Sequence, residues 1–255
     1  MSKKIQRHDQ ILNVLESNPS MRVSELASEL GVSAETVRRD LAELDETGRI
    51  KRTYGGAVRT KTFEPALAER SQLYIRERED IARLAVERVG DADNLFIGGG
   101  ATMLHFARAL RAVERPLTVL TPAFSIATEL STNPQIQVMA LPGIVEPKEG
   151  LVYGAETIKC IKQFRTSLTV VGASGVDERG VSEALLHAAQ VYAAMIEAAD
   201  ETLVLADASK FGNRSLQQIL HWRKNVSLIT DTGPPAPLLD AIAQSGAELI
   251  AADTA

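Results

Sequence analysis

The sequence has one cysteine, 4% aromatic residues and no long apolar run, and each shortage excludes a class of protein. Cys160 is the single cysteine in 255 residues, which rules out an internal disulfide and a metal site built from several cysteines. No stretch reaches the roughly 18 apolar residues of a membrane span, and the first ten residues lack the apolar core of a signal peptide. We therefore expect a cytoplasmic protein with no membrane partner.

Basic residues are also outnumbered, with 28 Lys and Arg against 33 Asp and Glu, for a net charge of −5. Over the whole chain, this balance argues against nucleic acid as a partner. The charge is not uniform, because residues 1–60 carry a net charge of +1 and the remainder carries −6. The pattern within these first residues, which we call the head, therefore decides whether it can contact phosphate.

Three short helices are predicted in the head. Apolar residues at helical spacing over 5–17 predict an amphipathic first helix. Serine is a preferred N-cap, so a second helix is expected to start at Ser24 and to stop at Gly31. Ser33 in turn caps a third helix that Gly48 ends.

The third helix has two faces. At about 100° per residue, Val37, Leu41 and Leu44 form one stripe that packs against the first two helices. Small, polar and bidentate side chains opposite that stripe are what base reading in the major groove requires. A solvated helix face is the alternative, but the capped three-helix context favours a helix-turn-helix. The outward residues are Glu35, Thr36, Arg38, Arg39 and Ala42.

Residues 50–59 predict two short strands joined around Gly55-Gly56, a pair typical of hairpin turns. A basic hairpin directly after a recognition helix is a wing placed to touch phosphate or enter the minor groove. Such contacts supply salt-dependent affinity rather than sequence choice. The alternative is a solvated hairpin that only closes the small domain. The expected wing contacts are Lys51, Arg52, Tyr54 and Arg59.

These motifs resemble those of the DeoR/GlpR family of bacterial winged helix-turn-helix transcriptional regulators. The family pattern SxxTxRRDLxxLxxxGxxxRxxGGA is present from Ser33 to Ala57, and DASKFG follows at 207–212. The resemblance implies a repressor of a carbohydrate or related catabolic operon, released from operator DNA by a small metabolite such as a sugar phosphate. The helix and the wing alone imply only sequence-specific binding of double-stranded DNA.

After a polar connection at 60–73, residues 74–255 alternate short apolar runs with helical segments. This predicts a mostly parallel sheet with helices on both faces, an α/β domain behind a winged helix-turn-helix at 1–59. The charged first half of a helix over 74–89 is expected to be a solvated face. The family body resembles the sugar-phosphate isomerase and CoA-transferase fold group. Further helices are expected at 102–112, 123–132, 188–199 and 236–245.

Loops at the expected carboxyl ends of the strands are the candidate effector site, because open α/β sheets bind ligands there. Glycines let backbone N–H groups approach an anion, and a helix N-terminus favours negative charge. Lys210 supplies a cation, and a surface lysine paired with Asp207 is the alternative interpretation. Tight turns that bind nothing are the alternative for the glycine loops. The expected effector contacts are Gly98, Gly99, Gly100, Ala101, Thr102, Thr121, Gly172, Asp207 and Lys210.

This chain departs from the family pattern at several polar positions of those loops. An effector with fewer hydroxyl contacts, or none at this site, is therefore the alternative to a sugar phosphate. The family usually has aspartate, asparagine, arginine, aspartate, glutamate and lysine where this chain has Gly98, Pro122, Glu146, Ser174, Ala188 and Tyr192.

The competing class is an enzyme that processes a phosphosugar on the isomerase-like scaffold. Acid–base catalysis requires a carboxylate or a histidine in the pocket, and the first loop has neither. His105 and His187 fall on or beside predicted helices, and no P-loop, zinc spacing or Ser-His-Asp signature is present. We expect no catalytic residue, no cofactor and no metal. The acidic body also argues against a non-specific nucleic-acid binder.

A homo-oligomer is expected as well. One small winged-helix head offers limited specificity, whereas paired heads read two half-sites. The contacts between subunits should come from the body, since the apolar positions of the head are used by its own core.

Overall fold

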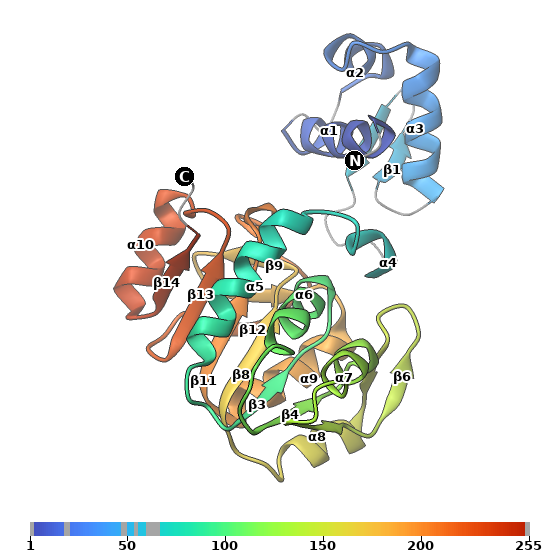
Figure 1. Ribbon diagram of the computed structural model, residues 1–255. Helices are drawn as coiled ribbons and strands as arrows, with labels where there is room; N and C mark the ends of the chain where they lie inside the picture. The colour runs from blue at the N-terminus through green and yellow to red at the C-terminus, as the bar shows by residue number, and fades with distance from the viewer. Residues whose placement is uncertain (1–2, 18–20, 47–49, 54–55, 60–66, 253–255) are drawn as a thin grey trace. The chain divides into compact units, whose positions relative to one another are not determined.

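The computed structural model describes residues 3–17, 21–46, 50–53, 56–59 and 67–252, which form two compact units (Figure 1). One unit spans residues 1–65 and the other residues 66–255. Residues 67–73, which the sequence assigned to a connection, belong to the second unit. They include helix α4 (Leu67–Arg70) and the buried side chain of Leu73.

The first unit consists of three helices and a hairpin, as predicted. Its core contains Ile11 and Leu15 of the first helix and the complete stripe of Val37, Leu41 and Leu44. The two strands are antiparallel, with Ile50 opposite Arg59. Tyr54 and Gly55, which the sequence predicted near the hairpin turn, lie outside the described part of the chain. The elements are α1 (Lys3–Ser17), α2 (Val23–Glu29), α3 (Ala34–Glu46), β1 (Ile50–Thr53) and β2 (Gly56–Arg59).

The predicted start is confirmed for α3 and wrong for α2. Ser33 caps α3 as predicted, because its Oγ accepts a hydrogen bond of 3.1 Å from the N–H of Thr36. Helix α2 begins at Val23 and not at Ser24. Its cap is formed by Glu25, whose carboxylate accepts from the N–H of Arg22 at 2.6 Å. The predicted stop of α3 at Gly48 lies outside the described residues.

The second unit is built on a sheet of seven parallel strands in the order β14-β13-β11-β8-β3-β4-β5. Its inner strands are apolar on both faces, as a sheet covered by helices on both sides requires. The strands are β3 (Asn94–Ile97), β4 (Leu117–Thr121), β5 (Ile136–Ala140), β8 (Thr166–Gly172), β11 (Ala199–Leu205), β13 (Val226–Thr230) and β14 (Glu248–Ala251).

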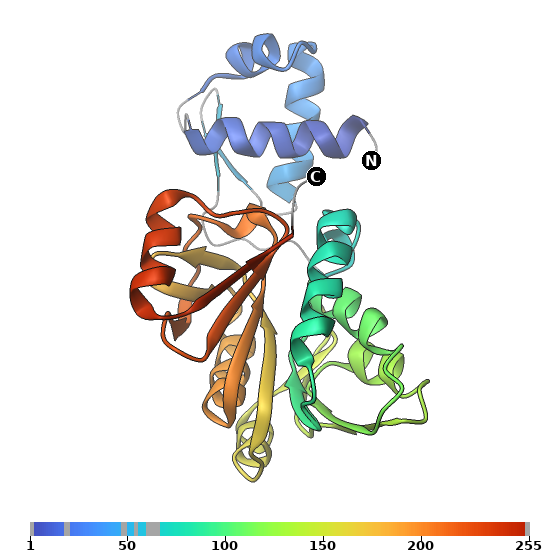
Figure 2. The same ribbon diagram turned by 60° about the vertical axis from the view of Figure 1, so that its left-hand side comes forward.

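Helices cover both faces of this sheet, so the predicted α/β architecture is confirmed. Helices α5, α6 and α7 pack side by side on one face, and α8 packs against α9 on the other. Figure 2 shows the sheet between α5 and α6 on one side and α10 on the other. The helices are α5 (Ile75–Val89), α6 (Ala101–Leu110), α7 (Phe124–Leu130), α8 (Ala155–Ile161), α9 (Leu186–Glu197) and α10 (Ala236–Ser245).

Helix α8 and several shorter elements have no counterpart in the prediction, because they lack the longer apolar runs by which the strands of the main sheet were recognised. The shorter ones surround the carboxyl ends of the long strands and include a hairpin, a small antiparallel sheet and one 3₁₀ turn. These elements are β6 (Ile144–Glu146), β7 (Leu151–Tyr153), β9 (Gly175–Asp177), β10 (Gly180–Glu183), η1 (Ala208–Lys210) and β12 (Gln217–His221).

The charged first half of α5 is not simply a solvated face. Arg78 in this half is only 3% exposed. Its Nη1 donates to the carbonyl oxygens of Arg70 and Leu73, at 2.5 and 2.7 Å. A single buried arginine therefore ties the backbone after α4 to α5, which the charge pattern of the sequence did not indicate.

Candidate functional sites

Helix α3 presents three charged residues to solvent on the side predicted to read DNA. Glu35, Arg38 and Arg39 are all exposed, and Arg38 lies 3.3 Å from Glu35 in a surface ion pair. Such pairs contribute little to stability, so the Arg38 guanidinium can exchange Glu35 for another partner at small cost. Thr36 is half-buried, and its hydroxyl lies 2.8 Å from that of Ser33. Three of the four predicted helix contacts are therefore freely accessible.

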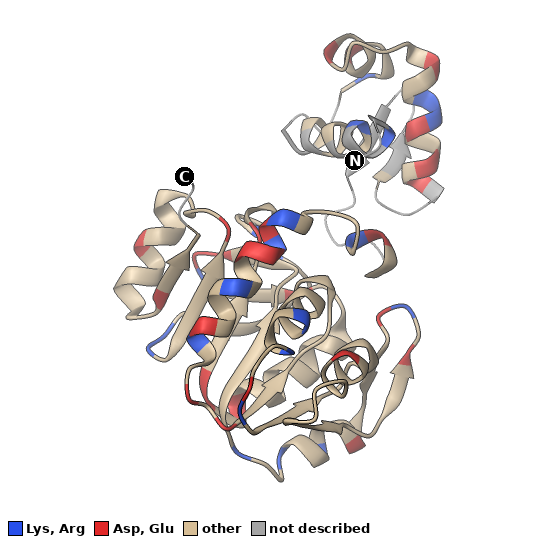
Figure 3. Cartoon of the chain, in the orientation of Figure 1, with Lys and Arg blue, Asp and Glu red and all other residues tan. Residues whose placement is uncertain are grey.

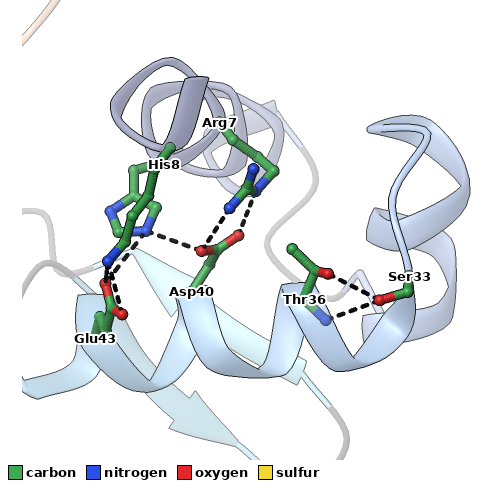
Figure 4. Close-up of polar contacts among 7 residues, drawn as sticks. Arg7, His8, Ser33, Thr36, Asp40 and Glu43 are labelled. Carbon is green, nitrogen blue, oxygen red and sulfur yellow. Dashed lines mark hydrogen bonds and ion pairs between the residues drawn. The ribbon is translucent and has the colours of Figure 1, made fainter. Parts of the chain in front are cut away.

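A polar cluster that was not predicted from the sequence joins α1 and α3 (Figure 4). Asp40 is 2% exposed and accepts hydrogen bonds from Arg7 at 2.5 and 3.0 Å. His8 Nε2 lies 3.2 Å from the same carboxylate, and Lys4 Nζ lies 2.6 Å from Glu43 on the next turn. The cluster joins the recognition helix to the first helix through charged groups as well as through the apolar stripe.

The electrostatics of Asp40 follow from this arrangement. Burial acts to raise the pKa of Asp40, but the hydrogen bonds and charges of Arg7 and His8 outweigh burial and leave the pKa below its ordinary value. A signal for the cluster exists in the sequence, because a wheel at about 100° per residue places Asp40 beside the apolar stripe and away from Arg39. The partner residues on α1, however, depend on how the two helices cross.

The strands of the predicted wing are present, and Lys51 and Arg59 lie on β1 and β2 in the backbone register. Their side chains, like that of Arg52, lie outside the described side chains, and Tyr54 lies outside the described residues. Figure 3 shows that the described charges along α3 are of both signs. The wing contacts with DNA therefore stay a prediction.

In the second unit, the first two predicted loops follow the adjacent strands β3 and β8, where the strand order reverses. From β3 the chain proceeds to β4 and β5 on one side, whereas β8 leads to β11, β13 and β14 on the other. The loops that follow the adjacent strands β3 and β8 therefore run in opposite directions. In open α/β sheets, ligands bind in the crevice at such a point. The pairing of β3 with β8 continues into the first loop, because the Gly98 N–H donates to the Val170 carbonyl oxygen at 2.9 Å.

Tyr192 of α9 lies against the first of these loops. Its hydroxyl accepts from Gly99 N–H at 3.1 Å and donates to Gly99 O at 3.3 Å. A Cβ at position 98 would lie 3.1 Å from the Tyr192 ring, so the glycine there permits this close approach. Gly100 has a φ of +114°, which also requires glycine, and it precedes α6. The loop is therefore shaped around a tyrosine side chain.

Two buried carboxylates act electrostatically on the tyrosine. Glu183 is 7% exposed, and its Oε1 accepts from Ser174 Oγ at 2.9 Å and from the N–H groups of Ala184 and Leu185. Burial raises the pKa of Tyr192, and the charge of Glu183 raises it further. Sequence analysis did not single out Glu183, because its proximity to the loop comes from the small sheet that contains β10.

A second carboxylate, Glu149, is paired with Arg70 of α4. Both side chains are largely buried, and both contribute to the electrostatics of Tyr192. Neither was predicted, because residues so far apart in the chain show no common pattern. Arg70 thus acts on Tyr192 from the segment that the sequence had assigned to a connection.

The third loop is organised by Asp207. Its Oδ1 accepts from Ser209 N–H at 3.2 Å and caps η1, and its Oδ2 lies 3.7 Å from Nε of Arg78. Lys210 is half-buried in the same loop. Thr121, another predicted contact, is 1% exposed and accepts from Ala123 N–H at 3.1 Å. Asp207 and Thr121 therefore stabilise the local backbone, and their contact with an effector stays a prediction.

Comparisons with known proteins agree with both units. A family model described as a DeoR-like helix-turn-helix domain matches residues 7–63, and one described as a DeoR C terminal sensor domain matches residues 74–232. The HTH-type transcriptional regulator YulB of Bacillus subtilis is 32% identical over 231 residues, 89% of each chain. The glycerol-3-phosphate regulon repressor of Escherichia coli is 28% identical and covers 94% of this chain and 96% of its own.

Among solved structures, ribose 5-phosphate isomerase A of Methanocaldococcus jannaschii is similar over 54% of each chain, with 19% identity and a TM-score of 0.41. Among the described residues, no helix combines the length and the apolar character needed to span a membrane.

Proposed function

The chain belongs to the DeoR family of transcriptional regulators, and from this premise we propose how its two units act. The head binds operator DNA through the exposed face of α3. The body binds a small metabolite at the carboxyl edge of its sheet, and that binding releases the DNA. Release requires a metabolite that prefers the DNA-incompetent state of the protein, so binding alone does not suffice.

One observation carries the DNA-binding part of the proposal. Arg38 and Arg39 are exposed on α3, while the next residue, Asp40, is buried against α1. The helix is thus held from one side and presents two guanidinium groups on the other. One guanidinium reaches a base edge and the other a phosphate. A bidentate contact to a base supplies about 1–3 kcal/mol of discrimination.

The test is a gel shift at fixed salt with DNA from upstream of the chain's own gene. Arg38→Ala and Arg39→Ala should each weaken specific binding. Arg83→Ala is the matched control, because Arg83 is a 66% exposed arginine of the body with a carboxylate three residues before it. Unchanged affinity in both head variants would contradict the assignment of α3.

The wing completes the proposed interface. Lys51, Arg52, Tyr54 and Arg59 are the proposed wing contacts, which touch phosphate or enter the minor groove. These contacts add affinity that falls with salt, without sequence choice.

The finer part of the effector proposal is a sugar phosphate bound over Gly98 to Thr102 with Lys210 nearby, as the family resemblance implies. In this form, Lys210→Ala should weaken release of operator by a phosphosugar. Because the Gly99 N–H already donates to Tyr192, a phosphate at this loop cannot use that donor while Tyr192 keeps its place.

We also propose that the protein is a cytoplasmic homo-oligomeric repressor of a carbohydrate or related catabolic operon. The regulon repressor from Escherichia coli named above supports the class of operon. Paired heads would read two half-sites, with the body supplying the subunit contacts. Light scattering should show an oligomer, and a monomer that binds operator as a monomer would contradict this part.

An enzyme on the same scaffold is the less favoured function. His187 is exposed and stacks on Tyr153, with ring centroids 4.1 Å apart. His105 is half-buried on α6, where burial and then the charges of Arg108 and Arg78 lower its pKa. Turnover assays with phosphosugars test this alternative, and the regulator proposal expects no turnover.

A further inference from the structure

Strand β5 forms one lateral edge of the seven-stranded sheet, and we call its outer side the β5 edge. On its inner side the strand pairs with β4, where the N–H of Leu141, the residue that follows β5, donates to the carbonyl oxygen of Thr121 at 2.9 Å. Backbone groups alternate between the two sides of a strand, so odd-numbered residues of β5 bond to β4 and even-numbered ones turn their N–H and C=O outward. Among the described residues no further strand pairs with β5, so this outward row can accept one.

The chain around the β5 edge carries no charge. Residues 130–145 contain no Asp, Glu, Lys, Arg or His, although 24% of the whole chain is charged. Three apolar side chains on β5 or just after it are exposed, Met139 by 37%, Ile144 by 62% and Val145 by 49%. Strands that stay at the edge of a sheet in solvent are commonly protected by charged side chains, prolines or bulges. Strand β5 itself has no charge and no proline, and its register with β4 is regular.

The opposite edge of the same sheet is protected in this way. Strand β14 begins with Glu248, whose carboxylate lies 3.2 Å from Arg88 and accepts from the hydroxyl of Ser227 at 3.0 Å. A further strand laid along β14 would therefore meet a charged side chain that is already paired. The two edges thus differ in the feature by which proteins prevent edge-to-edge association.

A second copy of this chain fits the β5 edge. In a two-fold contact both copies offer the same surface, so like charges on it would repel, whereas an uncharged segment meets itself without repulsion. In an antiparallel contact centred on Val138, the two Val138 residues bond in both directions, and Ala140 N–H of each copy donates to Ile136 O of the other. The N–H of Ile136 needs no new partner, because it donates to Asn133 O at 3.0 Å.

We propose that two copies of the chain pair antiparallel along β5 and continue the sheet across a two-fold axis. The inference rests on the proposed function, because it names the surface that holds together the oligomer proposed there. Met139, Ile144 and Val145 supply exposed apolar area beside the pair, and interfaces between identical subunits are richer in apolar area than the rest of a protein surface.

The first test is a cross-link at the two-fold axis. Directly opposite residues of an antiparallel pair have Cβ atoms about 5 Å apart, so Val138→Cys in the full-length chain should give a covalent dimer with a short bis-maleimide. Leu249→Cys is the matched control, because Leu249 is a half-buried aliphatic residue of the opposite edge strand, β14. The parent, whose single cysteine is Cys160, gives the baseline. An oligomer in which Val138→Cys cross-links no more than Leu249→Cys overturns the proposal.

The second test adds a charge, so it does not depend on the cross-linker. Ala140→Lys places a charge at an exposed position of β5, and it should raise the dissociation constant of the subunits at least tenfold in sedimentation of a dilution series. Ala251→Lys on β14 is the control and should behave as the parent does. An unchanged dissociation constant in Ala140→Lys overturns the proposal. A monomeric parent overturns it together with the oligomeric part of the proposed function, whereas loss of operator binding in a gel shift counts against the DNA-binding part alone.

Discussion

The two units bury polar side chains at different places relative to the residues that we propose bind a ligand. In the head, buried Asp40 anchors α3 to α1 and leaves Arg38 and Arg39 exposed on the other side of the helix. At the carboxyl edge of the body sheet, Tyr192 and Asp207 are buried and hydrogen-bonded within the protein. The face of α3 that we propose to read DNA thus keeps its arginines exposed to solvent, whereas the edge that we propose to bind the effector is lined by groups that already bond one another.

The largest effect should come from the body, where the buried ion pair is least accessible to water. Arg78→Ala removes the guanidinium that faces Asp207 and binds two carbonyl oxygens. We expect a loss of about 3–5 kcal/mol in the free energy of unfolding, the range for breaking a buried pair. Urea unfolding of the full chain measures it. Arg76→Ala, an exposed arginine two residues earlier, is the control and should change stability by less than about 0.5 kcal/mol.

The corresponding change in the head should have a smaller effect, because Arg7 keeps some access to water. Asp40→Ala should destabilise α3 by about 3 kcal/mol, at the lower end of the range for a buried pair. Native-state hydrogen exchange of amides in α3 reports this locally, with amides in α6 as an internal reference. Glu29→Ala, an exposed carboxylate of α2, is the control. An equal loss of protection in α6 would contradict the division into two separately stabilised units.

The exposed charges of the head should affect binding without affecting stability. Lys51→Ala removes one proposed phosphate contact of the wing. The negative slope of log affinity against log salt should therefore become shallower by about one. Operator affinity at several salt concentrations measures the slope. Discrimination between operator and unrelated DNA should stay the same, and a change in discrimination would assign Lys51 to base reading instead.

The smallest effect is a pH dependence confined to the head. The folded pKa of Asp40 is lowered, so its carboxylate stabilises the head at every pH above the ordinary aspartate pKa of about 4. This contribution is lost as the pH falls through the lowered folded value. Hydrogen-exchange stability of α3 should therefore decrease on acidification more steeply in the parent than in Asp40→Asn. Parallel curves would show that other groups dominate.

Local patterns predicted the head well. The spacing of Val37, Leu41 and Leu44 is a property of one helix, and all three are buried as expected. The cap at Ser33 depends on a contact three residues away, and it is present. The predicted start of α2 at Ser24 was wrong. The serine and the carboxylate of Glu25 are both capping groups, and it is the carboxylate that accepts from the Arg22 N–H.

Local patterns also predicted the seven strands of the main sheet and the helices α5, α6, α7, α9 and α10, because apolar runs and turn residues act over ten residues or fewer. Their boundaries shifted by about two residues, as at α6 and α9. The buried state of Arg78 was not predicted, because a charged helix segment gives no sign that one of its arginines faces a sheet.

The sequence by itself therefore determined the class of the protein, the order of its elements and the face of α3 that is free to meet DNA. These properties depend on residues within one or two helical turns of each other. Tertiary structure alone decided what fills the edge of the sheet. Tyr192 reaches Gly99 across 93 positions and Arg70 reaches Glu149 across 79, in each case because the strand order and the packed helices bring distant segments together. Contacts of that separation leave no periodic trace in a single chain, so only the folded structure shows them.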